Sequence, residues 1–280
     1  MVSYYKKACP DGWDFYTGKT INYRDSIGKV VEVPNKKGKA ILCSNNVIHA
    51  SWLPNCFTGS KIPCSVFIVS GKPVIKDHEK AGFRRLRILE EIPQSKLNEL
   101  FGWNYVEATA PIHPFKIVPP KVSDLQIALL KNWASVWASV WASVGASVGA
   151  SVGASIRASI RDSVGASVWA SVWASVWASV WASVWASIRD SVGASVWASV
   201  WASVWASVWA SVWAYIGSLF PNIKQWRCIK YEEGKYPFQP CVELWKMGLI
   251  PSFDGVVWRL HGGEKATVLF SISKAELTKK

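Results

Sequence analysis

The sequence predicts an α+β protein with a small α+β head, a tetrapeptide-repeat array and a C-terminal helix plus β-hairpin. Three observations predict this class. Short β-branched and aromatic runs separated by turn residues fill the first 93 residues, as is typical of short strands. A four-residue unit then repeats from Trp133 to Val212, and alternating apolar residues return near the C-terminus.

The head, residues 1–93, contains four expected strands. They cover residues 29–33, 40–43, 62–69 and 86–92, which are rich in β-branched or apolar side chains, the composition that fits a pleated sheet. Residues 94–122 form the next expected segment, with a short helix at Ser95–Phe101 followed by a stretch with four prolines. Because clustered prolines favour extended, semi-rigid chain, this stretch predicts a domain boundary.

The array, with its flanking helical turns, occupies residues 123–220. Each unit reads x-Ala/Asp-Ser-Val/Ile, where x is Trp, Gly or Arg, and thirteen of the 19 Trp residues lie between Trp133 and Trp213, at every fourth position wherever x is Trp. Helix signals on both sides, including Ser123-Asp124 as an N-cap, favour packed helices. A β-solenoid is the alternative, since alternation would place Ala and Val on one face, but no turn residue recurs at a fixed spacing.

A membrane-spanning array is the third and least favoured interpretation. Residues 167–188 carry no charge over 22 residues, which satisfies the length for a span. One residue in four is Ser and another is Trp, which prefers interfaces to the bilayer centre, so the mean hydropathy is weak. We therefore do not expect a membrane partner.

The variation at x indicates tolerance more than selected chemistry. Trp, Arg and Gly codons can differ at one base, and the block beginning at Ile160 recurs at Ile188, 28 residues later. This pattern indicates recent expansion of a 12-base repeat.

The tail, residues 221–280, has two clear local signals. Pro240 and Gly248 bracket a short apolar run, which predicts a helix over Cys241–Met247, since Pro is favoured at helix starts and Gly just after helix ends. Two alternating runs, 256–260 and 268–272, flank His261-Gly262-Gly263-Glu264. They predict a β-hairpin.

The net charge of +13 lies almost entirely outside the array. It permits a nucleic acid or another anionic partner for the head. The N-terminus lacks the apolar core of a secretory signal, and the six cysteines include no C-x-x-C pair, so we expect a cytoplasmic protein with reduced thiols. The spacing of Cys43, His49, Cys56 and Cys64 matches no common zinc pattern, and no metal or cofactor is expected.

Two resemblances concern the head. The segments Ile41–Ser51 (ILCSNNVIHAS), Ile62–Val69 and Gly71-Lys-Pro-Val, followed by the array, resemble an uncharacterised N-terminal domain of phage and environmental proteins that precedes tandem x-Ala/Asp-Ala/Ser-Val repeats. This resemblance implies no established activity and no site residue.

The second resemblance is to ADP-ribosyltransferase-like domains. It rests on Tyr23-Arg24, on Ile48-His49-Ala50-Ser51 and on a late Glu90 or Glu91. It implies that Arg24 or His49 would hold a nicotinamide dinucleotide and that Glu90 would orient its ribose. These three residues, His49, Arg24 and Glu90, are the only candidate site residues.

The sequence favours a non-enzymatic structural or interaction protein. Its Trp-rich array would act as a scaffold or self-association element for a protein partner. The alternatives are a head that binds a nicotinamide dinucleotide, as the second resemblance implies, and a basic adaptor that binds nucleic acid through the head. No P-loop, dinucleotide fingerprint or serine-hydrolase motif is present, and an enzyme is the less favoured class.

Overall fold

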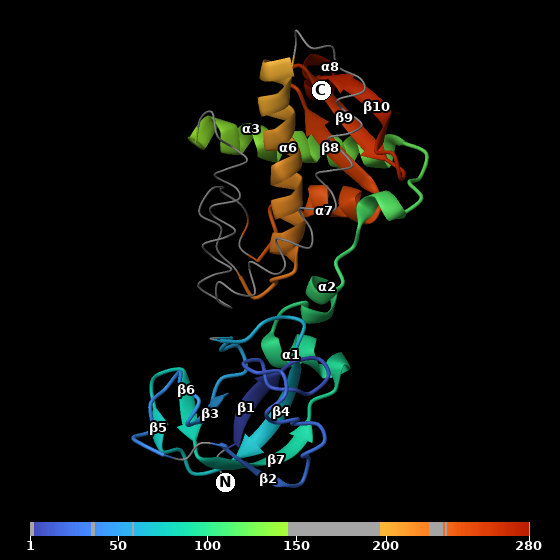
Figure 1. The fold of residues 1–280 in the computed structure, drawn as a ribbon. Coiled ribbons are helices and arrows are strands. Elements are labelled where there is room, and N and C mark those ends of the chain that lie inside the picture. Colours follow the sequence, from blue (N-terminus) through green and yellow to red (C-terminus); the bar gives the residue numbers. More distant parts are fainter. Residues whose placement is uncertain are drawn as a thin grey trace. The chain divides into compact units, whose positions relative to one another are not determined.

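The computed structural model describes residues 3–34, 37–57, 59–144, 197–223, 232 and 234–279. The chain divides into two compact units (Figure 1). The described part of unit 1 ends at Thr109, and that of unit 2 begins at Ala110. Helices and antiparallel sheets occur together, so the predicted α+β class is confirmed.

Unit 1 is built on a seven-stranded antiparallel sheet with the strand order β2-β7-β4-β1-β3-β6-β5. The strands are β1 (Ser3–Ala8), β2 (Val30–Glu32), β3 (Ile48–Ser51), β4 (Ser65–Ser70), β5 (Ile75–Lys76), β6 (Lys80–Phe83) and β7 (Arg85–Glu91). The strands predicted at 29–33, 62–69 and 86–92 correspond to β2, β4 and β7. The sequence did not predict β1, β3, β5 or β6.

The strand predicted at residues 40–43 is wrong. The chain turns here, and Cys43 has a φ of 62°, in the left-handed region that extended strands do not use. Ser44 Oγ donates to the carbonyl oxygen of Ile41, and Asn46 Nδ2 donates to that of Lys39. Such local side-chain bonds compete with sheet pairing, which explains why an apolar run became a turn.

The main core of unit 1 covers one face of the sheet. Alternate residues from five strands form it, including Tyr4, Ala50, Phe67, Phe83 and Ile88. These side chains share a face because directly paired residues of antiparallel strands point to the same side.

A second, aromatic cluster extends unit 1 beyond residue 93. It includes Phe101 of α1 (Leu97–Phe101), which follows the 3-10 turn η1 (Gln94–Lys96), and Tyr105 of α2 (Tyr105–Thr109). The Tyr105 hydroxyl accepts from the backbone N–H of Cys64 and donates to its carbonyl oxygen. The predicted helix at 95–101 is therefore part of this unit, and the expected head boundary at 93 falls short of where these contacts end.

Unit 2 combines helices with a three-stranded antiparallel sheet of order β10-β9-β8 (Figure 1). The elements are the 3-10 turn η2 (Pro114–Lys116), α3 (Asp124–Val144), α6 (Trp197–Ser218), α7 (Gln239–Lys246), β8 (Leu249–Phe253), β9 (Val257–Gly262), β10 (Thr267–Ser273) and α8 (Lys274–Thr278). The predicted hairpin is β9–β10 and the predicted helix is α7. Gly248, at a φ of 79°, ends that helix as expected.

The described tetrads are helical, as the sequence favoured. They lie in α3 and α6, and α3 begins at the predicted N-cap, where Gln126 Oε1 accepts from the backbone N–H and the hydroxyl of Ser123. Residues 145–196 of the array lie outside the described residues. Among those described, no helix combines the length and apolar character needed to cross a bilayer.

Both ends of the array belong to the core of unit 2. In α3, the Trp133 ring lies 6.4 Å from that of Phe238, and Trp137 meets Trp258 edge-on at 6.1 Å. Helices α3 and α6 both contact α7, and α6 also contacts β8. Trp133 and Trp137 are buried.

The serine position of a tetrad also carries a structural contact. In α6, the buried Ser207 Oγ accepts from the backbone N–H of Phe253, the last residue of β8, at 2.9 Å. Trp213, four residues beyond Trp209, is buried too. The last tetrads are thus structural elements of unit 2.

Candidate functional site

A cavity of about 630 Å³ opens in unit 1 where β1 and β3 separate. The two strands pair only at Tyr5 and Ser51, whereas β1 pairs with β4 along its whole length. Beyond that pair, Lys6 and Lys7 of β1 and residues 48–50 of β3 all line the cavity. Neighbouring strand residues point to opposite faces, so both lysines reach one cavity because the sheet is open there. Its volume falls in the range of about 300–1,000 Å³ typical of small-molecule sites.

The cavity carries an excess of positive charge. Its described lining includes three lysines, Lys6, Lys7 and Lys80, and a single carboxylate, Asp14. A concave, partly apolar site with one sign of charge concentrates ions of the opposite sign. The lining therefore favours an anionic ligand.

Two of the three lysines are held by the protein. Lys7 Nζ donates to the carbonyl oxygen of Cys56 at 2.6 Å and lies 4.5 Å from the ring centroid of Phe57. Lys80 Nζ donates to Cys43 Sγ at 3.0 Å. This hydrogen bond raises the pKa of Lys80, whereas burial lowers the pKa of Lys7 to about 8.

Lys6 differs from both. Its Nζ lies 5.1 Å from the ring centroid of Tyr23, and the described residues offer it no hydrogen bond or ion pair. It lies between the core residues Tyr4 and Ala8, on the same face of β1. Burial lowers the pKa of Lys6 to about 8, although the Asp14 carboxylate acts in the opposite direction. An ammonium group without an acceptor in a cavity is a binding position for an anion.

Asp14 organises the loop that forms one wall of the cavity. Its carboxylate accepts from the backbone N–H groups of Tyr16, Thr17 and Thr20 at 2.7–3.0 Å, and from the Thr17 hydroxyl at 2.8 Å. Burial alone would raise the pKa of Asp14, but these hydrogen bonds outweigh it and lower the pKa to about 2. Asp14 therefore stays ionised, and its oxygens are occupied within its own loop.

His49 lies in the cavity wall on β3, half-buried. Its Nε2 accepts from the backbone N–H of Cys43 at 2.8 Å, which leaves the ring hydrogen on Nδ1. Burial first, and then the Lys6 and Lys80 ammonium groups, lower the pKa of His49 to about 4. The ring is neutral near pH 7 and can donate one hydrogen bond from Nδ1.

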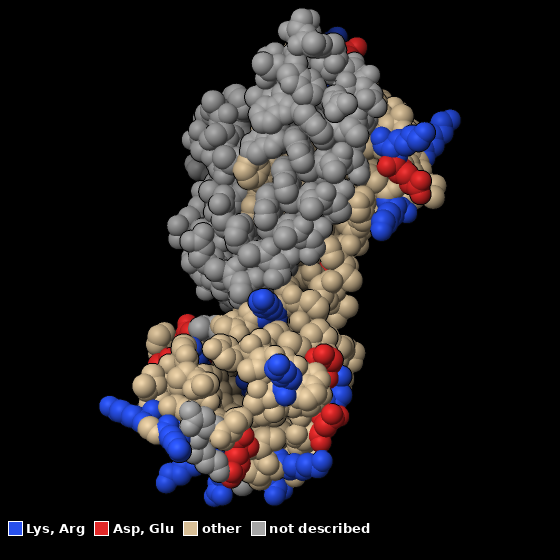
Figure 2. All heavy atoms as spheres, viewed as in Figure 1, with Lys and Arg blue, Asp and Glu red and all other residues tan. Residues whose placement is uncertain are grey.

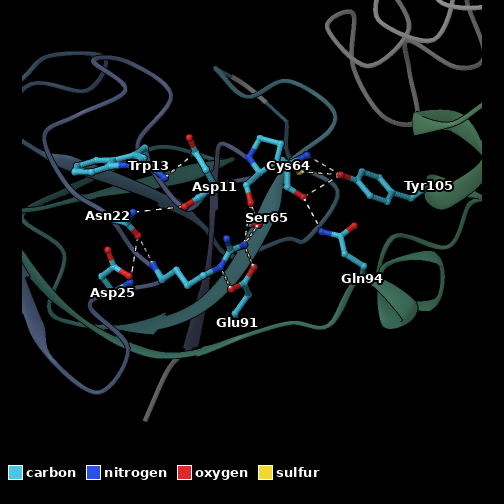
Figure 3. A network of polar contacts seen from close by, with 11 residues as sticks. Asp11, Trp13, Asn22, Asp25, Cys64, Ser65, Glu91, Gln94 and Tyr105 are labelled. Atoms are coloured by element: carbon cyan, nitrogen blue, oxygen red, sulfur yellow. Dashed lines mark hydrogen bonds and ion pairs between the residues drawn. The ribbon is translucent and has the colours of Figure 1, made fainter.

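The structure places Arg24 and Glu90 elsewhere. Arg24 forms a two-pronged ion pair with Glu91, at 2.6 and 2.7 Å, and its guanidinium also donates to Ser65 Oγ and to the carbonyl oxygen of Pro10 (Figure 3). The hydrogen bond donated by Arg24 lowers the pKa of Glu91. Glu90 is exposed on β7. Neither Arg24 nor Glu90 lines the cavity that contains His49, so the three candidate residues are not assembled around one space.

Other chemical groupings do not form an accessible site in the described residues. No cluster of three or more His, Cys, Asp or Glu suited to a metal ion occurs there. A buried pair in unit 2 joins His261 Nε2 and Ser252 Oγ at 2.7 Å, and His261 Nδ1 contacts the carbonyl oxygen of Ala266 at 3.0 Å. Both side chains have 0% exposure, so no substrate reaches them and the pair is structural.

The cavity lysines were missed by sequence reasoning. A signal existed, because Tyr4, Lys6 and Ala8 alternate with Tyr5 and Lys7 as in a strand. The charges obscured that alternation, and Lys80 lies far away in the sequence. His49 was the one lining residue singled out.

No protein-family model, curated protein or solved structure matches the chain. The geometry and charge of the cavity are therefore the features of this chain that bear on its function.

Proposed function

We propose that unit 1 is a non-enzymatic binding module that takes a small anionic molecule into the cavity between β1 and β3. The observation that carries this proposal is the Lys6 ammonium group, which faces the cavity without a hydrogen-bond acceptor among the described residues. A bound carboxylate or phosphate would supply that acceptor, and charge-assisted hydrogen bonds of this kind are roughly twice as strong as neutral ones.

A small ligand fits unit 1 better than a nucleic acid does. Nucleic-acid binding through phosphates needs a continuous basic surface. Figure 2 instead shows Lys and Arg side chains interspersed with Asp and Glu over the visible face of unit 1. The three cavity lysines lie in a concave site that a duplex cannot enter. A nucleic-acid adaptor would bind with a steep salt dependence, and filter binding at two salt concentrations tests that alternative.

The test is calorimetric titration of the full chain with oxalate, inorganic pyrophosphate and a nicotinamide dinucleotide. We expect Lys6→Met to weaken every anion that binds, whereas Lys72→Met, which removes the same charge from an exposed position, leaves the affinities unchanged. Identical affinities in the wild type and Lys6→Met would overturn the proposal.

A stability measurement separates a binding residue from a structural one. Because burying an unpaired ammonium group is unfavourable, Lys6→Met should stabilise unit 1 against urea, on the order of 1–3 kcal/mol, while it weakens binding. A structural lysine would show the reverse, and loss of stability in Lys6→Met would count against the site.

The nicotinamide dinucleotide is the second candidate ligand. The observation that favours it is His49 in the cavity wall, with Nδ1 available as a donor. The ion pair of Arg24 with Glu91 gives it no support. We expect His49→Ala to weaken the dinucleotide more than pyrophosphate; equal effects on the two would remove the dinucleotide as a specific ligand.

The Trp-rich array remains the proposed scaffold. The described Trp side chains at positions 133, 137 and 213 are buried in unit 2, which supports a structural role for these tetrads. Self-association through the array is tested by light scattering during size exclusion. A monomer at high protein concentration would contradict it.

A further inference from the structure

The cavity holds three primary amines in different chemical situations. Lys7 donates to a carbonyl oxygen and Lys80 to a thiol. The Lys6 amine is the one whose Nζ, among the described lining residues, has no such bond. An amine that is not engaged in a hydrogen bond has its lone pair free once the proton is lost, so it can react as well as bind.

We propose that Lys6 forms a reversible Schiff base with an anionic ligand that carries an aldehyde or ketone, with the other cavity lysines attracting the anion. This inference rests on the proposed function, since the same cavity must first hold the anion. It goes further by assigning a covalent step to one residue and by naming the ligand class as carbonyl-bearing acids or phosphates.

The step balances without an oxidant or reductant. Lys6 loses a proton to solvent, and its amine nitrogen forms a bond with the carbonyl carbon. The carbonyl oxygen then leaves as water, carrying both hydrogens of the neutral amine. The product is an imine, which gains a proton on nitrogen, so that one ammonium group and one carbonyl give one protonated imine and one water. Hydrolysis reverses the step.

The surroundings of Lys6 favour the neutral amine, which is the form that reacts with a carbonyl group. Burial among the core residues of β1 disfavours the ammonium form of Lys6, and the lowered pKa of about 8 gives an appreciable neutral fraction near pH 7. That fraction is about 300-fold larger than for a lysine of pKa 10.5. Lys7 shares the lowered pKa, but its Nζ is held by the Cys56 carbonyl oxygen and by the rings of Phe57 and Phe101.

The test uses glyoxylate, a small acid with an aldehyde, and the full chain. Cyanoborohydride reduces any imine to a stable secondary amine, and peptide mass spectrometry then locates it. We expect the adduct at Lys6 to form more than about tenfold faster than at the exposed Lys72. Excess oxalate should suppress the Lys6 adduct and spare Lys72, and acetaldehyde, which lacks the anion, should show less preference for Lys6.

Lys6→Arg separates this inference from the proposed function. Arginine keeps a positive charge in the cavity but has no primary amine and remains protonated. We expect oxalate binding by Lys6→Arg to remain measurable, with the cavity adduct absent. If the wild type binds oxalate but labels Lys6 no faster than Lys72, the Schiff base is refuted and the binding function stands. If neither protein binds oxalate or glyoxylate, both proposals fail.

Discussion

Anion binding to the cavity should weaken as the pH rises through 8. Lys6 binds an anion only as the ammonium ion, and burial lowers its pKa to about 8. The charged fraction then falls from about 0.9 at pH 7 to about 0.1 at pH 9, so the contribution of Lys6 to the affinity should fall about tenfold, equivalent to about 1.4 kcal/mol. A lysine of ordinary pKa would remain charged over this interval. The charged group that opposes the shift is Asp14, which stays ionised throughout.

Oxalate suits this measurement because its own charge is constant between pH 7 and 9. Lys7 has a similarly lowered pKa, while His49 is neutral over the range, so the wild-type slope contains contributions from two lysines. Lys6→Arg stays charged and should lose the Lys6 share of the slope. Calorimetry at four pH values would refute the reasoning if the wild-type affinity is constant, or if Lys6→Arg keeps the same slope.

Three further predictions concern stability. Ser207→Ala leaves the backbone N–H at the end of β8 without its acceptor and should lower the free energy of unfolding in urea by about 1–3 kcal/mol. Ser135→Ala, at the same tetrad position but exposed, should change that free energy by less than about 0.5 kcal/mol. Equal effects of the two substitutions would contradict the structural role of Ser207. Burial lowers the pKa of His261 to about 4, so the stability that its neutral form gives is fully present above pH 6.5 and is lost as the pH falls towards 4. The free energy of unfolding of unit 2 should therefore fall by about 2 kcal/mol between pH 7 and 5. His261→Gln should remove that loss. Arg24→Gln breaks a partly exposed ion pair and should cost about 1 kcal/mol, whereas Glu90→Gln should change the midpoint little; a larger effect of Glu90→Gln would refute this assignment.

Local sequence signals predicted the elements in which apolar and polar residues alternate without interruption, or in which residues typical of helix ends mark both ends of a helix. The β9–β10 hairpin and α7 were found because apolar alternation and the Pro–Gly bracket depend on neighbours in the sequence. The strand β1 was missed because Lys6 and Lys7 break the apolar pattern that identifies a strand. The turn at Cys43 was read as a strand because its apolar composition conceals the local side-chain bonds that bend it.

The cavity could not be predicted, for a different reason. It requires β1 and β3, whose paired residues Tyr5 and Ser51 are 46 positions apart, to be neighbours that pair once and then separate. No periodicity encodes that departure from pairing. The sequence identified His49 but associated it with Arg24 and Glu90. In the structure, Arg24 donates a hydrogen bond to Ser65 of β4, and Glu90 of β7 pairs with Ile68 of β4.

Because α3 and α6, the helices that carry the first and last described tetrads, both contact α7, the array enters and leaves through the same folded unit. In evolutionary terms, unit 2 is the host of an insertion whose two junctions share one core. Slippage of the 12-base repeat changes the copy number in whole tetrads, which preserves the reading frame and leaves both junctions intact. Selection for a stable unit 2 then acts on the copies that contain Trp133, Trp137, Ser207 and Trp213. Alleles that differ by several interior copies should therefore share the same tail structure.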